Sequence, residues 1–64
     1  MYKFKEGLDI KISKTEASKV IGITREYLSY IMNRSKTCSK PVAYCIAKFL
    51  NEESEISDYF DRVS

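Results

Sequence analysis

The sequence has no histidine, and its 64 residues include only two cysteines, two glycines and one proline. Without histidine, and with the cysteines seven positions apart rather than in a CxxC pair, the usual ligand set of a zinc site is incomplete. The sequence also lacks a glycine-rich phosphate loop and a convincing pair of nucleophile and base. We therefore expect no metal, no cofactor and no enzymatic activity.

Long apolar runs are missing as well. The N-terminal residues contain no apolar run of signal-peptide length, and no stretch approaches the roughly eighteen apolar residues that suggest a membrane span. We expect a cytoplasmic protein with no membrane contact, in which the thiols of Cys38 and Cys45 stay reduced. A chain of this length forms at most one domain, residues 1–64, which is only marginally stable alone.

The formal net charge of +2 conceals an uneven distribution along the chain. Residues 11–48 carry eight basic and two acidic side chains, a net charge of +6, whereas residues 49–64 carry five acidic and one basic, a net charge of −4. A concentrated basic region in a nearly neutral protein is typical of proteins that bind polyanions. Charge alone does not distinguish this from an ordinary solvated surface.

The first twelve residues alternate apolar and polar side chains, which is typical of a strand. A three-residue loop that ends at Gly7 predicts a β-hairpin in which residues 2–4 pair with residues 8–10 and Lys3 faces Asp9. In this register all the apolar side chains share one face. A short helix over residues 1–12 is the alternative.

The S-x-x-E pattern of residues 13–16 is that of a capping box and predicts a helix that ends near Ile21. Gly22 suits the left-handed residue that ends a helix, and Thr24 is a good N-cap for the next one. A three-residue turn containing glycine sets two helices at a steep angle, as in helix-turn-helix units that bind DNA. The predicted unit covers residues 14–33.

The second helix of this unit, residues 25–34, has two unlike faces when its side chains are projected at about 100° per residue. One face carries hydrogen-bonding side chains: Arg25, Glu26, Ser29, Tyr30 and Asn33. The opposite face carries apolar side chains: Tyr27, Leu28 and Ile31. We expect the apolar face to be buried and the polar face to stay free.

Two supporting helices are expected after the unit. Ser39 can cap a helix over residues 40–50, in which Pro41 is tolerated in the first turn and Cys45 lies on the core-facing stripe. The last helix, residues 55–63, carries four apolar side chains on one side: Ile56, Tyr59, Phe60 and Val63. They can complete the core, and because the domain is small we expect part of their surface to form a homodimer contact. The N-terminal hairpin is the alternative contact.

The segment from Lys14 to Asn33 resembles the lambda-repressor-like (Cro/cI or XRE) helix-turn-helix domains. The phrase GITREYLSYIMN is close to that of the family, whose small residue and turn glycine match Ser18 and Gly22. Five buried family positions match apolar residues here: Ala17, Ile21, Ile23, Leu28 and Ile31. The resemblance covers roughly residues 12–51. It implies a mainly α fold, a small bundle of about four helices. The chain departs from the family at its start, where the strand-like residues 1–12, a possible N-terminal β-hairpin, stand in place of the usual first helix.

The resemblance also implies a function: a sequence-specific, double-stranded-DNA-binding transcriptional regulator of the phage or mobile-element Cro/repressor type. The family's base-contacting positions fall on Arg25, Glu26, Ser29 and Tyr30, with Asn33 at the margin. These side chains suit a major groove, in which arginine binds guanine and glutamate accepts from cytosine.

Side chains near the ends of the unit are expected to contact the sugar–phosphate backbone: Lys14, Thr24, Arg34, Ser35, Lys36 and Lys40. Since helix-turn-helix proteins commonly bind two half-sites as symmetric dimers, we expect a homodimer on a palindromic operator. No small-molecule effector is evident. The alternative function is a protein-interaction module, such as an antitoxin or antirepressor, that uses the acidic residues 52–61.

Overall fold

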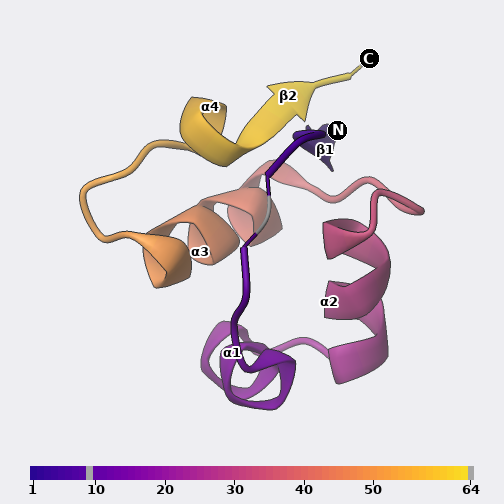
Figure 1. The fold of residues 1–64 in the computed structure, drawn as a ribbon, viewed down its shortest axis with the longest axis vertical. Coiled ribbons are helices and arrows are strands. Elements are labelled where there is room, and N and C mark those ends of the chain that lie inside the picture. Colours follow the sequence, from indigo (N-terminus) through magenta and orange to yellow (C-terminus); the bar gives the residue numbers. More distant parts are fainter. Residues whose placement is uncertain (9, 64) are drawn as a thin grey trace.

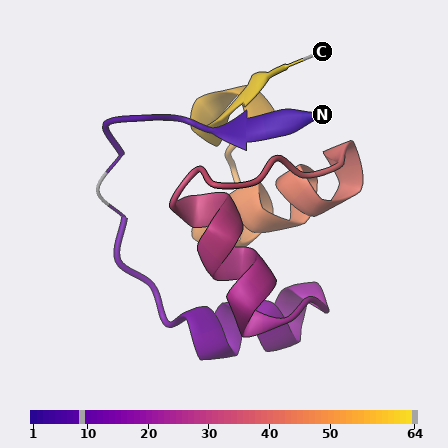
Figure 2. The ribbon, with the colours of Figure 1, turned by 90° about the vertical axis from the view of Figure 1, so that its right-hand side faces the viewer.

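Within residues 1–8 and 10–63, which the computed structural model describes, the chain forms four helices and a two-stranded sheet. Their order is β1 (Tyr2–Phe4), α1 (Lys14–Ile21), α2 (Arg25–Met32), α3 (Lys40–Leu50), α4 (Ile56–Tyr59) and β2 (Phe60–Arg62). The sheet and α4 lie at one end of the molecule, above α3, and α1 lies at the other end (Figures 1 and 2). No helix in the described part of the chain is both long and apolar enough to cross a bilayer.

Local signals fix the turn between α1 and α2. Each helix begins at a capped N-terminus, because the Ser13 and Thr24 hydroxyls each accept a hydrogen bond from the N–H three residues further on, at 3.3 and 3.1 Å. Gly22 closes α1 at a φ of 91°, and its N–H donates to the Ser18 carbonyl at 2.8 Å. A side chain at this left-handed position costs about 1–2 kcal/mol, so glycine suits it.

The second helix ends at Met32, two residues earlier than its sequence predicts. Asn33 is its C-cap, and Arg34 follows at a φ of 69°, which an α-helix cannot accommodate. The N–H of Ser35 then donates to the Tyr30 carbonyl at 2.9 Å, closing the last turn. The chain turns away from the helix axis at this point.

The strand β1 lies where the alternating pattern predicts one, but its partner is not residues 8–10. It pairs antiparallel with β2, so that Lys3 lies opposite Asp61. Gly7 has the expected left-handed φ, at 83°, yet the chain beyond it continues toward α1 instead of turning back (Figure 2). The predicted N-terminal hairpin is therefore wrong, as is the helical alternative. The pair expected between Lys3 and Asp9 lies outside the described residues because of Asp9.

The predicted last helix, residues 55–63, is wrong beyond Tyr59. Here α4 is a single turn, closed by the Phe60 N–H donating to the Ile56 carbonyl, and the chain then becomes the strand β2. An isolated helix this short is marginal in water, whereas the extended chain gains hydrogen-bonding partners on β1. It also buries the Phe60 ring against Phe4, with ring centroids 5.3 Å apart in an edge-to-face arrangement.

The core lies between α1, α2, α3 and the sheet. Its most buried apolar side chains are Phe4, Ala17, Leu28, Ile31, Cys38, Ala43, Ile46, Ala47 and Phe60. On α3 the buried stripe therefore falls on the two alanines and Ile46, and Cys45 is exposed instead of core-facing.

Cys38 is the buried cysteine. Its N–H and carbonyl both pair with Tyr2, at 2.8 Å each, so the segment before α3 lies against the edge of β1. Its side chain is fully excluded from solvent. Burial raises the pKa of the Cys38 thiol to about 11, and the thiol therefore stays protonated near neutral pH.

Candidate nucleic-acid interface

The polar face of α2 is free because the opposite face is anchored in the core. Leu28 and Ile31 have no exposed surface, as their helical positions predict. Arg25 and Glu26 are exposed in the first turn, and Tyr30 is 46 % exposed one turn later. The structure thus confirms the division of this helix into an anchoring face and a solvent-facing one.

A hollow of about 420 Å³ lies along this free face, beside the first turn of α1. Its lining side chains are Lys14, Thr15, Arg25, Glu26, Ser29 and Tyr30. The structure therefore brings together four of the five residues predicted to contact bases and one predicted to contact the backbone. We call this surface the α2 hollow.

The sequence interpretation missed Thr15 as a member of the α2 hollow. It is exposed in the first turn of α1, next to Lys14. The signal in the sequence is its place directly after Lys14, which the same interpretation assigned to a DNA-backbone contact. Its hydroxyl adds a further donor and acceptor to the hollow.

The charged side chains of the α2 hollow are not neutralised by neighbours in the described residues. The ion pairs of the described part of the chain are Lys3–Glu6 and Lys5–Asp61, each at 3.9 Å. Both lie at the sheet end of the molecule, away from the hollow. Two cations and one carboxylate thus face solvent in the hollow. They are available to a ligand without breaking an internal pair.

Lys36 extends the basic surface beyond the α2 hollow. Its ammonium lies 5.1 Å from the centroid of the Tyr30 ring, within the range of a cation–π contact. Both side chains are exposed. The contact holds the charge of Lys36, one of the side chains expected to contact a DNA backbone, close to the hollow.

Three other predicted residues lie at the ends of α2 but do not line the hollow. Thr24 is exposed, and its Oγ1 accepts the capping hydrogen bond from the Tyr27 N–H. Asn33 Oδ1 accepts from the N–H of Ser35 at 2.9 Å, so part of the asparagine side chain serves the turn. Ser35, the third, is exposed as well. The side chains of Thr24, Asn33 and Ser35 thus keep hydrogen-bond donors for a partner that extends beyond the hollow.

Arg34 is turned inward, which corrects the expectation that it contacts a DNA backbone. Its Nε and Nη2 donate to the Lys5 carbonyl at 3.0 and 2.6 Å, and Nη2 also approaches the Leu8 carbonyl at 3.4 Å. The guanidinium lies 5.5 Å from the centroid of the Phe4 ring. Its hydrogen-bonding capacity is used to hold the segment after β1 against the end of α2.

The remaining predicted residues lie away from the α2 hollow. Lys40 lines a separate groove between α3 and α4. Among the side chains predicted to form a homodimer contact, Phe60 is only 2 % exposed because it packs in the core, so its place on a dimer surface is corrected. Ile56, Tyr59 and Val63 are half-buried.

Taken together, the α2 hollow offers a guanidinium, an ammonium, a carboxylate and hydroxyl groups on one concave face. These are the groups that bind base edges and phosphate oxygens in protein–DNA complexes. Comparisons of the chain with models of known protein families, with curated proteins and with solved structures find no match. The function is therefore inferred from the chemistry and geometry of this surface.

Proposed function

We propose that this chain is a sequence-specific, double-stranded-DNA-binding transcriptional regulator with a lambda-repressor-like fold, of the phage or mobile-element Cro/repressor type. The observation that supports the proposal is the α2 hollow: polar, charged and free of internal ion pairs, on a helix whose other face is buried. A B-DNA major groove about 12 Å wide admits one α-helix. Helix α2 is the element that enters it.

Each side chain in the hollow has a role that follows from its donors and acceptors. Arg25 donates two parallel hydrogen bonds to the O6 and N7 atoms of guanine, and Glu26 accepts from the N4 amino group of cytosine. Ser29 contacts either kind of base edge, and Tyr30 packs on a thymine methyl group or donates to a phosphate. Lys14 lies at the margin of the helix pair, where it binds a phosphate oxygen.

The protein binds its operator as a homodimer. Two copies related by a two-fold axis place their α2 helices in successive major grooves, about 34–36 Å apart, and such an arrangement selects a palindromic site. One copy of α2 has too few base-contacting side chains to define a long operator. Pairing doubles the number of bases contacted.

The proposal is tested by selecting bound sites from a random double-stranded DNA pool and then measuring affinities by mobility shift across a salt series. Arg25→Ala weakens binding to the selected site by about 1–3 kcal/mol and relaxes the preference at one position. Lys14→Ala weakens binding to all sequences alike and reduces the slope of log K against log salt by about 1. Lys19→Ala is the matched control, since Lys19 is exposed on α1 but does not line the hollow.

The proposal predicts that the selected DNA pool contains a defined sequence motif and that the Lys19→Ala variant selects the same motif. A pool without enrichment, or binding that does not respond to salt, would contradict the proposal. Equal losses in all three variants would show that the surface has been assigned to the wrong face.

A further inference from the structure

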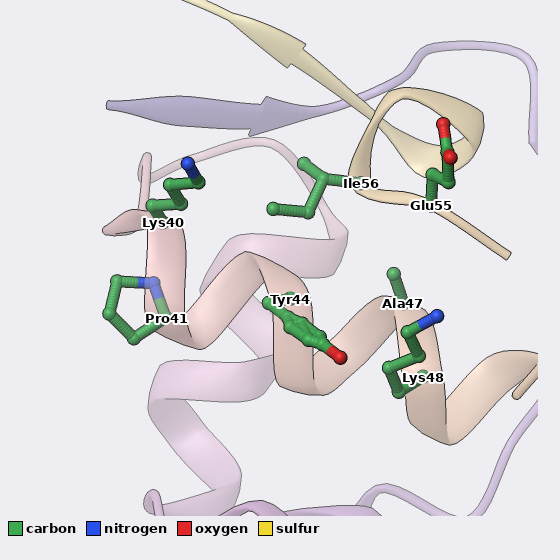
Figure 3. Close-up of a pocket in the computed structure, with 7 residues that line it drawn as sticks. All are labelled: Lys40, Pro41, Tyr44, Ala47, Lys48, Glu55 and Ile56. Atoms are coloured by element: carbon green, nitrogen blue, oxygen red, sulfur yellow. The ribbon is translucent and has the colours of Figure 1, made fainter.

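An apolar groove of about 500 Å³ lies between α3 and α4, on elements that do not contribute to the α2 hollow. Its lining residues are Lys40, Pro41, Tyr44, Ala47, Lys48, Glu55 and Ile56 (Figure 3). Tyr44 is 45 % exposed at its centre, with Ile56 facing it from α4. Concave apolar surfaces with exposed aromatic side chains are typical of binding sites.

The two ends of this groove carry opposite charges. Figure 3 shows Lys40 at the N-terminal end of α3 and Glu55 at the other end of the groove, with Tyr44 and Ile56 between them. Within the described residues, neither Lys40 nor Glu55 forms an ion pair. The groove is thus an apolar strip with the Lys40 ammonium at one end and, at the other, the Glu55 carboxylate, which also takes part in the capping box at the start of α4.

Lys48 lies near the Glu55 end but its ammonium is already engaged. It donates to the Ser54 carbonyl at 2.7 Å and to the Glu52 carbonyl at 3.1 Å, and it lies 5.4 Å from the centroid of the Tyr44 ring. These contacts use its donors to close the loop after α3. Lys48 keeps its positive charge beside Glu55, but because its ammonium is held by these contacts, the side chains left to pair with a partner are Lys40 and Glu55.

We propose that this groove binds a second copy of the chain across a two-fold axis that passes close to Tyr44 and Ile56. In such a pair the same surface is used twice, so the groove must be complementary to itself. The antiparallel arrangement of the two α3 helices places Lys40 of each copy against Glu55 of the other, and the two tyrosines meet at the centre. The inference deepens the proposed function by naming the homodimer surface, but the interface forms without DNA.

The open edge of β2 is a less suitable surface for a second copy. The Phe60 N–H is already used by the Ile56 carbonyl, which leaves few donors on that edge. Two β2 strands from two copies can pair antiparallel about Asp61 or about Arg62, which are both exposed. In either register the charged side chain at the centre lies directly opposite the same side chain of the other copy. Like charges in that position destabilise a pair of strands.

The experiment measures self-association by sedimentation equilibrium over a wide concentration range, with circular dichroism to check that each variant is folded. Tyr44→Asp, at an exposed position, raises the dimer dissociation constant roughly ten-fold or more. Lys40→Glu and Glu55→Lys each weaken self-association because each creates two like-charge contacts. An equimolar mixture of these two variants restores association, since both contacts in the mixed dimer then join opposite charges.

Two control variants separate this groove from other surfaces. Lys19→Glu makes the same change in net charge on an exposed part of α1, and Val20→Asp alters a 66 % exposed side chain of a neighbouring apolar hollow. Both leave the dissociation constant unchanged. A wild-type chain that stays monomeric at every concentration overturns the proposal. So does a folded mixture of Lys40→Glu and Glu55→Lys in which association is not restored. A Val20→Asp variant that self-associates more weakly than Tyr44→Asp overturns it as well.

The outcome for the dimer is independent of the outcome for DNA. If the groove pairs two copies and DNA binding is absent, the dimer surface stands and the proposed function fails. If a selected DNA site binds the wild-type chain while Tyr44→Asp associates as well as wild type, the function stands and the surface assignment is overturned.

Discussion

At the scale of single residues, the environment decides roles that neighbours in the sequence do not reveal. Arg34 lies in a polar, basic segment typical of phosphate contacts, yet its guanidinium points back to the Lys5 and Leu8 carbonyls. Cys38 lies between two lysines but is fully buried. In both cases the deciding contact is with the first eight residues, far away in sequence. For Arg34, local composition therefore predicted the wrong role.

We predict that Arg34→Lys destabilises the fold by about 1–2 kcal/mol although it keeps the positive charge. A lysine has no planar fork that can donate from two nitrogens to one carbonyl, and it loses part of the contact with the Phe4 ring. Urea unfolding followed by circular dichroism measures the difference. Lys36→Arg, a charge-conserving change at an exposed site nearby, is the matched control and leaves the free energy of unfolding within about 0.5 kcal/mol of wild type.

The same pair of variants distinguishes a structural arginine from one that contacts DNA. An Arg34→Lys variant that unfolds like the wild type but has lost affinity for DNA would contradict the inward orientation of the guanidinium. A loss of stability with unchanged affinity of the folded protein agrees with it.

At the scale of elements, what could be predicted depended on the range of the signals. The helices α1 and α2 follow from the caps Ser13 and Thr24, a turn glycine and helical periodicity, all within a few residues of one another, and the free face of α2 follows with them. Helix α3 follows from periodicity, since Ser39 precedes it without a side-chain capping hydrogen bond. The pairing of β1 with β2 joins the two ends of the chain, and no local pattern specifies it. Residues 60–62 satisfy a helical stripe equally well, and the strand is favoured by the hydrogen bonds to β1 and the buried contact with Phe4, both distant in sequence.

The edge-to-face contact of Phe4 and Phe60 predicts energetic coupling between the two ends of the chain. Phe4→Leu and Phe60→Leu each destabilise the fold by about 1 kcal/mol, and the double variant loses less than their sum because the ring contact can be lost only once. The coupling energy is about 0.5–1.5 kcal/mol, measured by urea unfolding of the four proteins in the cycle.

A non-interacting pair gives the reference for this cycle. Tyr44→Leu on the exposed face of α3, combined with Phe4→Leu, is expected to be additive within about 0.5 kcal/mol under monomeric conditions. Additive losses for Phe4→Leu and Phe60→Leu as well would mean that the C-terminal residues do not form the strand beside β1.

At the scale of the whole molecule, charge is separated in space as well as in sequence. Helix α2 lies on one side, and the loop between α3 and α4 projects from the opposite side in Figure 1 and lies behind the molecule in Figure 2. That loop carries Glu52 and Glu53, both exposed. A polyanion is therefore attracted to the α2 side and repelled by the acidic loop, which favours one orientation of approach.

This arrangement predicts how neutralising the loop changes DNA binding. The molecule measures 27 × 25 × 22 Å. The distance from the acidic loop to DNA bound at α2, on the opposite side, is therefore shorter than the Debye length of about 30 Å at 0.01 M salt and longer than that of about 8 Å at 0.15 M. Glu52→Gln combined with Glu53→Gln therefore tightens binding about two- to threefold at low salt and has no effect at 0.15 M. Fluorescence anisotropy with the selected site and a scrambled duplex measures both conditions.

The gain at low salt must be the same for the selected and the scrambled duplex, because a distant charge acts on phosphates and not on bases. Arg25→Ala is the contrasting variant: its effect persists at 0.15 M salt and is larger for the selected duplex. A gain from the loop variant that survives at 0.15 M, or that differs between the duplexes, would place the two glutamates in direct contact with DNA. The side of the molecule that carries α2 would then not be the only one to face the operator.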